Sequence, residues 1–222
     1  CRDCALISER LATSAAGELL TLPEGFNLEL EDPREYMQSM FYDGGAHQKE
    51  KFGLFGSSDP YPLLSDRTDV LVFETSPLRK DVEITGNIQV VIWISSSAAD
   101  TDFTAKLIDA YPSSEDYKDG YHLNLSDSII RCRYRNGFNK AEMMEPGKLY
   151  KIHIPLPPIS NIFKSNHRIR LDIASSNFPR FDVNPNTGEE IGKQTHMIKA
   201  TNTVYMGKRY LSHVVLPVIL IK

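Results

Sequence analysis

Residues 87–95 read NIQVVIWIS, and this stretch decides the fold class. Isoleucine or valine occupies every second position from Ile88 to Ile94, and the intervening positions include Val91 and Trp93. An alternation of period two predicts a β-strand, and apolar residues on both faces are typical of a central strand between packed layers. The segment therefore predicts a strand at the centre of a double sheet.

The same alternation recurs along the rest of the chain. Further strands are predicted at residues 69–75, 103–111, 128–135, 148–154, 167–173, 202–206 and 212–220. In 128–135, Ile130, Cys132 and Tyr134 are expected to face inward. In 167–173, Ile169, Leu171 and Ile173 are expected inward, with Arg168, Arg170 and Asp172 outward. Turns are expected at Thr85-Gly86-Asn87, Lys118-Asp119-Gly120, Glu145-Pro146-Gly147 and Met206-Gly207.

Eight or more strands at this spacing predict an all-β fold, a sandwich or jelly roll. A short helix of about two turns is expected after Asp32, which could cap it, with Pro33 in its first turn. We expect residues 1–9 to be a tail or linker remnant and residues 10–222 to form a single domain.

Composition restricts the function classes. The 222 residues are 41% hydrophobic and 24% charged, which is ordinary for a globular protein, and the net charge of −4 does not favour nucleic acid. No apolar run is long enough for a membrane-spanning helix, and no secretory signal is expected at the N-terminus. Three cysteines favour a reducing compartment, hence a cytoplasmic protein, and leave secretion open.

Motifs for catalysis and metal binding are incomplete. No G-x-S-x-G nucleophile elbow occurs, and Ser57 and Ser58 lack the flanking pattern. The six histidines are scattered, and the Cys1–Cys4 pair has no second pair to complete a zinc site. We therefore expect no catalytic residue, no metal and no cofactor in this chain.

Two charged groups have alternative interpretations. Three carboxylates lie close in sequence and could bind calcium: Asp100, Asp102 and Asp109. The favoured role of Asp102 and Asp109 is instead to accept hydrogen bonds from turn amides. Three arginines share the outward face of 128–135 and are expected to form a salt-bridged or domain-facing surface rather than a nucleic-acid site: Arg131, Arg133 and Arg135.

Six blocks in order resemble the C-terminal domain of the X-Pro dipeptidyl-peptidase and cocaine-esterase family, which includes α-amino-acid ester hydrolases and glutaryl-cephalosporin acylases. The blocks span residues 69–86, 96–112, 128–135, 145–156, 166–188 and 212–219, and weaker similarity extends the match to about residues 10 to 220. The resemblance implies a jelly-roll β-sandwich of galactose-binding-like type. It also implies that the Ser-Asp-His triad lies upstream, in an α/β-hydrolase domain.

This chain departs from the family at two positions within these blocks. Asn166 stands where the family usually has glycine before a histidine, and Asn tolerates the left-handed conformation that such a turn requires. Val183 stands where the family often has arginine. We expect the turn to survive and one ion pair to be absent.

Aromatic and apolar residues in two loops are the candidate site. Phe178 and Phe181 lie in the turn-rich stretch after residue 173 and are expected to seal the sandwich end or a seam with the hydrolase domain. Phe52, Leu54 and Phe55 lie in the long loop 41–66 and are expected to contact the hydrolase domain near its acyl pocket, or else to cover the sandwich end.

The leading hypothesis is a non-catalytic domain that packs on an α/β-hydrolase domain of the same polypeptide and helps to shape its acyl pocket. The parent enzyme would cleave a small acyl ester, an amide or an X-Pro peptide, and a homo-oligomer is left open. No nucleic acid or membrane partner is expected. The rival hypothesis is a free-standing, lectin-like module that binds carbohydrate. Such modules present exposed aromatic residues, and the one tryptophan, Trp93, falls in a predicted core strand.

Overall fold

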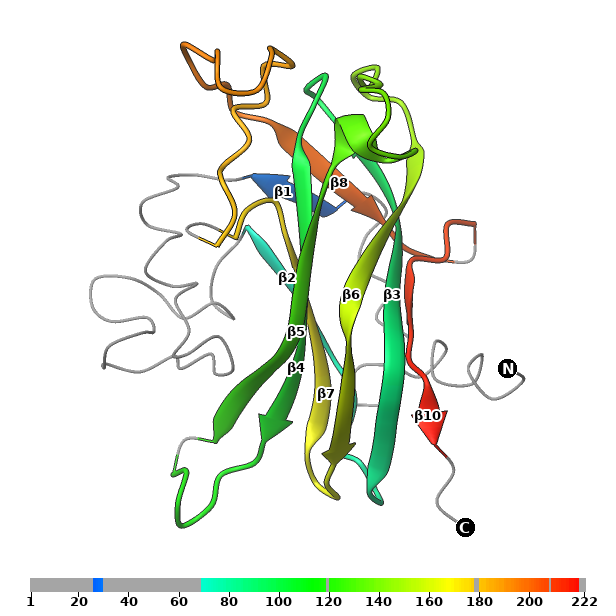
Figure 1. The fold of residues 1–222 in the computed structure, drawn as a ribbon. Coiled ribbons are helices and arrows are strands. Elements are labelled where there is room, and N and C mark those ends of the chain that lie inside the picture. The colour runs from blue at the N-terminus through cyan, green and yellow to red at the C-terminus, as the bar shows by residue number, and fades with distance from the viewer. Residues whose placement is uncertain (1–25, 30–68, 119, 178–179, 208, 220–222) are drawn as a thin grey trace.

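Two antiparallel sheets face each other in a β-sandwich (Figure 1). The computed structural model describes residues 26–29, 69–118, 120–177, 180–207 and 209–219. Its elements are β1 (Phe26–Glu29), β2 (Val70–Glu74), β3 (Val82–Ser96), β4 (Asp102–Tyr111), β5 (Tyr121–Arg131), the 3₁₀ helix η3 (Cys132–Tyr134), β6 (Tyr150–Phe163), β7 (Arg168–Ala174), β8 (Thr201–Tyr205), β9 (His213–Val215) and β10 (Val218–Ile219).

The six-stranded sheet is built around β3, the strand that contains NIQVVIWIS. Strand β6 pairs with β3 along nearly its whole length, from Val82 opposite Phe163 to Ile94 opposite Tyr150. The other side of β3 pairs with three short strands in succession, β8, β9 and β10, and β1 pairs with β8. The prediction of a central strand is confirmed.

The second sheet has four strands in the order β2-β7-β4-β5. Its strand β4 lies between β5 and β7, so its backbone is hydrogen-bonded on both sides. At one edge of the sandwich the two sheets approach each other, where the Ser126 hydroxyl of β5 donates to the carbonyl of Pro157 in β6 at 2.9 Å. Prolines in β6 lack the N–H that pairing with a further strand would need.

The hydrophobic core lies between the sheets and follows the predicted alternation. From β3 it takes Ile88, Val90, Ile92 and Ile94, which are all at most 3% exposed. From the facing sheet it takes Phe103, Ala105 and Leu107 of β4, and Ile169, Leu171 and Ile173 of β7. Burial of these inward rows supplies the main driving force for closing the sandwich.

Local departures from the predicted elements have physical causes. The expected turn at Gly86 is a bulge inside β3, where the register with β6 shifts between Gly86 and Ile88. Gly86 has a φ of 132°, and a Cβ there would lie 3.2 Å from the ring of Pro217. The expected strand 128–135 ends at Arg131 because η3 begins at Cys132, and the expected strand 212–220 is divided at Leu216 and Pro217.

The left-handed turn predicted at Asn166 is present, with a φ of 69°. The all-β sandwich is therefore confirmed, while the jelly-roll and galactose-binding-like type remains a prediction. The extent of the domain, residues 10–222, and the tail at residues 1–9 also remain predictions. The helix expected after Asp32 lies outside the described residues.

Candidate functional site

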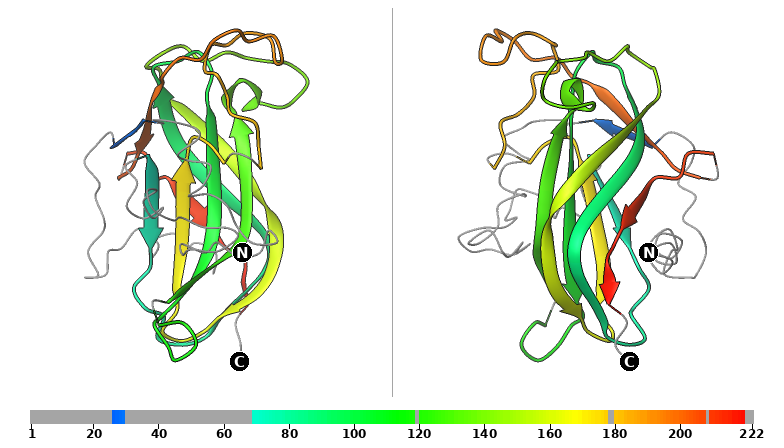
Figure 2. Two further views of the ribbon diagram at one scale, coloured as in Figure 1. Left: turned by 90° about the vertical axis from the view of Figure 1, so that its left-hand side faces the viewer. Right: turned by 45° about the vertical axis from the view of Figure 1, so that its right-hand side comes forward.

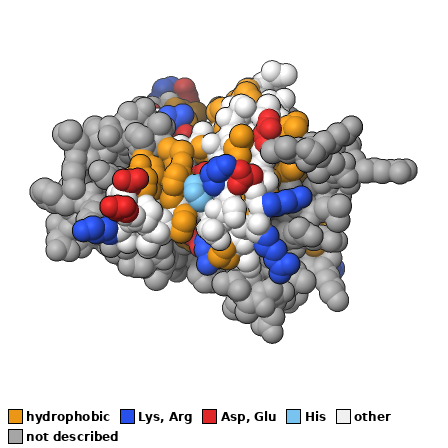
Figure 3. Space-filling view, turned by 90° about the horizontal axis from the view of Figure 1, so that it is seen from below, with side chains coloured by type: hydrophobic (Ala, Val, Ile, Leu, Met, Phe, Trp, Pro, Cys, Tyr) orange, Lys and Arg blue, Asp and Glu red, His pale blue; other side chains and the backbone are white. Residues whose placement is uncertain are grey.

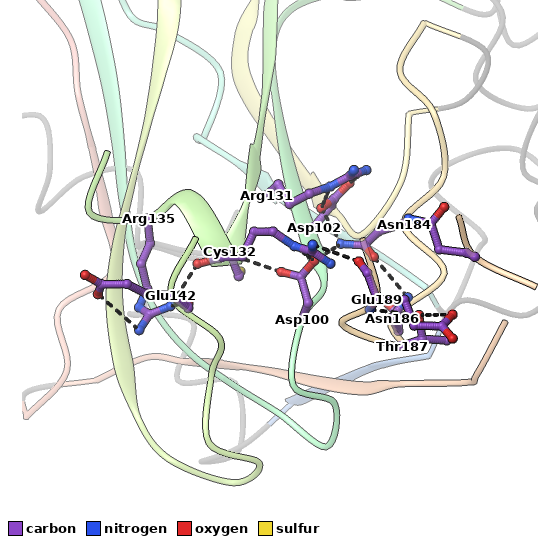
Figure 4. A network of polar contacts seen from close by, with 12 residues as sticks. Asp100, Asp102, Arg131, Cys132, Arg135, Glu142, Asn184, Asn186, Thr187 and Glu189 are labelled. Atoms are coloured by element: carbon purple, nitrogen blue, oxygen red, sulfur yellow. Dashed lines mark hydrogen bonds and ion pairs between the residues drawn. The ribbon is translucent and has the colours of Figure 1, made fainter. Parts of the chain in front are cut away.

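A buried polar network closes one end of the sandwich (Figure 4). The Arg131 guanidinium donates through Nε and Nη2 to the two oxygens of Asp102, both at 3.0 Å. The Arg133 backbone N–H and Nε donate to the two oxygens of Asp100 at 2.9 and 2.7 Å. Two-point arginine–carboxylate contacts fix orientation as well as distance. The start of β4 is thereby tied to the end of β5 and to η3.

The outcome for these charges differs in part from the sequence-based expectations. The arginines do form salt bridges, but Arg133 is only 4% exposed rather than outward-facing. The partners of Asp102 are the side chains of Arg131 and Asn184, not turn amides. The cause is that η3 begins after Arg131, so that Arg133 lies against Asp100 instead of on a strand face.

Asn184 joins the two ion pairs and attaches the loop that follows β7. Its Nδ2 donates to Asp100 at 2.9 Å and to Asp102 at 2.8 Å. Arg133 Nη1 donates to the carbonyl of Glu189 at 2.9 Å, which holds the loop at a second point. Asn184 thus holds this turn-rich segment through its side-chain amide.

Burial in this network changes the pKa of two side chains, Asp102 and Cys132. Burial raises the pKa of Asp102, although the hydrogen bond and charge of Arg131 oppose this effect. Burial also raises the pKa of Cys132 well above its ordinary value, which keeps this thiol in its unreactive neutral form. These groups are therefore structural rather than nucleophilic.

A second charged cluster lies on the outer face of the four-stranded sheet. The pair Arg170–Asp172 has two hydrogen bonds of 2.8 and 3.0 Å, and its members are 1% and 3% exposed. Lys106 on the adjacent strand β4 is also 1% exposed, and burial lowers its pKa to about 8. Arg170 and Asp172 were predicted to face outward, which they do, but they are buried rather than solvated.

This second cluster holds the other end of the same loop. Asn177 Nδ2 donates to Asp127 at 2.7 Å, and Arg180 Nε lies 3.2 Å from the same carboxylate. Asn177, Arg180 and Asn184 are therefore each held by buried carboxylates. Between these points, Phe181 is half-buried and lies 5.5 Å from the Arg180 guanidinium.

The predicted site residues can be placed only in part. Phe181 lies in the loop just described and does not belong to the hydrophobic core. Its predicted neighbour Phe178 lies outside the described residues, as do Phe52, Leu54 and Phe55. Their contact with a hydrolase domain remains a prediction.

A histidine–carboxylate pair lies at the opposite end of the sandwich. His167 Nδ1 lies 2.9 Å from Asp109, whose other oxygen accepts from Asn161 at 3.3 Å, and burial raises the pKa of Asp109. The Asn166 N–H donates to the carbonyl of Leu78, and the Leu78 N–H donates to the carbonyl of His167. These two backbone hydrogen bonds hold the β6–β7 turn in place. Seen from below (Figure 3), the described side chains mix both charge signs with apolar groups.

Other site types find no support in the described part of the chain. No group of three or more His, Cys, Asp or Glu side chains there could hold a metal ion. No helix among the described residues is long and apolar enough to cross a membrane. An apolar cavity between the sheets, beside Ile92 and Leu171, has a volume of about 40 Å³, whereas small-molecule sites occupy roughly 300–1,000 Å³.

Comparisons with known proteins agree with this domain architecture. Residues 31–215 match the model of the X-Pro dipeptidyl-peptidase C-terminal non-catalytic domain. The chain is 41% identical over 166 residues to cocaine esterase from Rhodococcus sp. (strain MB1 Bresler), covering 74% of this chain and 28% of that enzyme. It is 27% identical over 161 residues to a putative serine esterase from Mycobacterium bovis, covering 68% of this chain and 24% of that protein.

Solved structures give the same result. An aminopeptidase from a marine sediment archaeon of the Thaumarchaeota superposes with a TM-score of 0.66 at 33% identity, over 70% of this chain and 27% of that one. An α-amino acid ester hydrolase has the same TM-score and identity, over 70% of this chain and 26% of that one. The chain thus spans about a quarter of the length of these relatives.

Proposed function

The chain belongs to the family of X-Pro dipeptidyl-peptidase C-terminal non-catalytic domains, and from this premise we propose that it is the accessory β-sandwich of a serine acyl hydrolase. In this proposal it packs on an α/β-hydrolase domain of the same polypeptide and forms one wall of the acyl pocket. The observation that carries the proposal is its 41% identity to cocaine esterase over only 28% of that enzyme.

The chemistry of the parent enzyme would lie outside this chain. A serine activated by histidine and aspartate attacks the acyl carbonyl and forms an acyl-enzyme, which water then hydrolyses. The 222 residues contain no G-x-S-x-G elbow to present such a serine. The accessory domain would shape one wall of the acyl pocket and exclude water from it. The shape of that wall would decide which acyl groups fit.

The fixed loop supports a seam rather than a catalytic role. Its described part, residues 180–184, is held by Arg180 on Asp127 and by Asn184 on Asp100 and Asp102 before any partner binds. A loop that is already ordered loses less conformational entropy on docking. Phe181 on this segment is half-buried and lies outside the core, so its ring can contribute to a domain contact.

The test uses the full-length polypeptide with Phe181→Ala and, separately, with Leu54 and Phe55 both changed to Ala. The measurement is kcat/KM for p-nitrophenyl esters of acetate, butyrate and benzoate. If these residues form a pocket wall, the ratio of kcat/KM for the large acyl group to kcat/KM for the small one should change by about 10-fold or more. The reason is that one methylene in a pocket is worth about 1–3 kcal/mol.

Leu211→Ala is the matched control, because Leu211 is 65% exposed and lies in the loop between β8 and β9. It should leave both the ratio and the melting temperature unchanged. If the loop variants lower the melting temperature and reduce kcat/KM equally for all three esters, these residues serve packing only and the pocket-wall proposal is wrong.

A further inference from the structure

The outer face of the six-stranded sheet carries an aromatic and basic surface. We call it the Trp93 face and define it by six residues: Trp93, Tyr205, Tyr210, Lys151, His153 and Arg209. Trp93 lies on the central strand, but its side chain points away from the core and is half-buried. The sequence alone did not predict this surface, because its members come from three segments more than 50 residues apart.

Strand register places these side chains in adjacent rows. Trp93 lies opposite Lys151 of β6 on one side and opposite Tyr205 of β8 on the other. In the next outward row, Val91 lies between His153 of β6 and His213 of β9. Figure 2 (right) shows β6 and the β9–β10 segment on opposite sides of β3. Directly paired side chains on one face of a sheet are close neighbours, so the rows form one continuous surface.

The aromatic rings contact one another, and hydrogen bonds hold the Tyr205 hydroxyl and the backbone beside Trp93 and Tyr205. The Tyr210 ring lies 5.4 Å from that of Trp93 and 5.7 Å from that of Tyr205. The Tyr205 hydroxyl is 3.0 Å from the Ser95 hydroxyl. Ser212 accepts from the Trp93 backbone N–H at 3.0 Å and donates to the Tyr205 carbonyl at 2.6 Å. Rings fixed in this way present a rigid platform at low entropic cost.

The charge on this surface has one sign. Lys151 Nζ lies 6.0 Å from the centre of the Trp93 ring, and the Arg209 guanidinium lies 5.4 Å from that of Tyr210. Both cationic residues are exposed. In the described rows from Gln89 to Ser95 and in their partners on β6, β8 and β9, no outward position carries Asp or Glu. This differs from the whole chain, whose net charge is −4.

From these observations we propose that the Trp93 face binds an anionic saccharide. The apolar face of a pyranose ring packs on the aromatic platform, as aromatic side chains do in other ligand sites. The sugar's acidic group lies between Lys151 and Arg209. Its hydroxyls bond the exposed pair Gln89 and His153, whose side-chain nitrogens are 3.0 Å apart and add polar groups on the same face.

Charge and shape favour this occupant over the alternatives. A simple inorganic anion would use the cations but not the three rings, and a neutral sugar would use the rings but not the cations. An acidic protein segment would satisfy the charges, but the platform offers exposed polar nitrogens beside flat rings, which suit a ring that carries hydroxyls. These alternatives are separate outcomes of the test.

The test uses the full 222-residue chain, after a cooperative thermal melt has shown that it is folded. Trp93 is the only tryptophan of the chain, so its fluorescence reports directly on the proposed site. The probes are oligogalacturonate, a heparin-derived oligosaccharide, neutral maltohexaose, poly-glutamate and sodium sulfate. We expect a saturable change in emission with at least one of the two acidic saccharides, at least about tenfold tighter than with maltohexaose and weakened by salt.

Matched variants identify the contacts. Tyr210→Ala should abolish the response, and Lys151→Gln with Arg209→Gln should remove the preference for acidic over neutral sugar. Lys148→Gln is the control, since Lys148 is an exposed lysine 5.9 Å from a different ring, that of Tyr150, and it should bind as the parent chain does.

The difference between the carboxylated and the sulfated saccharide identifies the acidic group. No response to either overturns the proposal. So does an equal response to maltohexaose, to poly-glutamate or to sodium sulfate, or an unchanged response in Tyr210→Ala. None of these outcomes bears on whether the domain belongs to a hydrolase, so the two proposals fail separately.

Discussion

Replacement of Lys106 by Met should change how the free energy of unfolding depends on pH. Lys106 lies on the outer face of β4 and is 1% exposed, and its charged neighbours are Asp127, Asp172, Arg170 and Arg180. Burial lowers its pKa from 10.5 to about 8, although the two carboxylates oppose this effect. Below about pH 8, Lys106 is charged in both states. Only the folded protein then has the free-energy cost of burying that charge.

The sign and size follow from proton linkage. Between about pH 8 and pH 10.5 the unfolded chain keeps the proton on Lys106 and the folded protein releases it, so stability rises with pH in this window. One pH unit corresponds to about 1.4 kcal/mol, so a lowered pKa of about 8 gives a rise of about 3 kcal/mol. Lys106→Met removes this contribution, while other titrating groups remain in both proteins.

The assay is urea unfolding followed by circular dichroism at several pH values from 8 to 10.5. The stability of the parent chain relative to Lys106→Met should rise by about 3 kcal/mol across the window. Lys148→Met is the control: the hydrogen bond that Lys148 donates to Glu145 raises the pKa of this exposed lysine, so the change must not give such a rise. A difference between parent and Lys106→Met that stays constant would refute the assignment of a buried lysine.

Three further sets of substitutions test the fold. Ile92→Ala and Leu171→Ala each remove an inward side chain and should cost ~2–5 kcal/mol in urea unfolding; an unchanged midpoint for both would mean that the strand faces are assigned backwards. Arg133→Met leaves Asp100 buried without its cation and should cost about 3–5 kcal/mol, and adding Asp100→Leu should recover part of the loss; a double variant less stable than the single one would contradict this. At Asn166, with a φ of 69°, a change to Gly should be tolerated while Ala should cost about 1–2 kcal/mol, and equal melting temperatures would exclude the strained turn.

Features with a local cause could be predicted from the sequence. The period-two pattern identified β3, β4 and β7 and the inward residues of β3 and β7, because burial of one strand face imposes that pattern directly. The left-handed turn at Asn166 followed from the tolerance of asparagine for positive φ.

Features that depend on distant segments could not be predicted in this way. The pairing of Asp100 with Arg133 and Asn184 joins residues 33 and 84 positions apart, and no periodicity records such contacts. The alternation placed Arg170 on the outer face correctly but could not show that this face is buried. For the same reason Gly86 was expected in a turn, since a glycine beside Asn signals a turn and a bulge alike.

If this domain serves a serine hydrolase, as we propose, the nucleophile lies elsewhere in the polypeptide. The most direct measurement is labelling of the native gene product with a fluorophosphonate, followed by mass determination and mapping of the modified peptide. We expect a product substantially longer than 222 residues that is labelled once, on a serine outside this sequence. Labelling of a serine within these 222 residues, or a native product no longer than this chain, would contradict it.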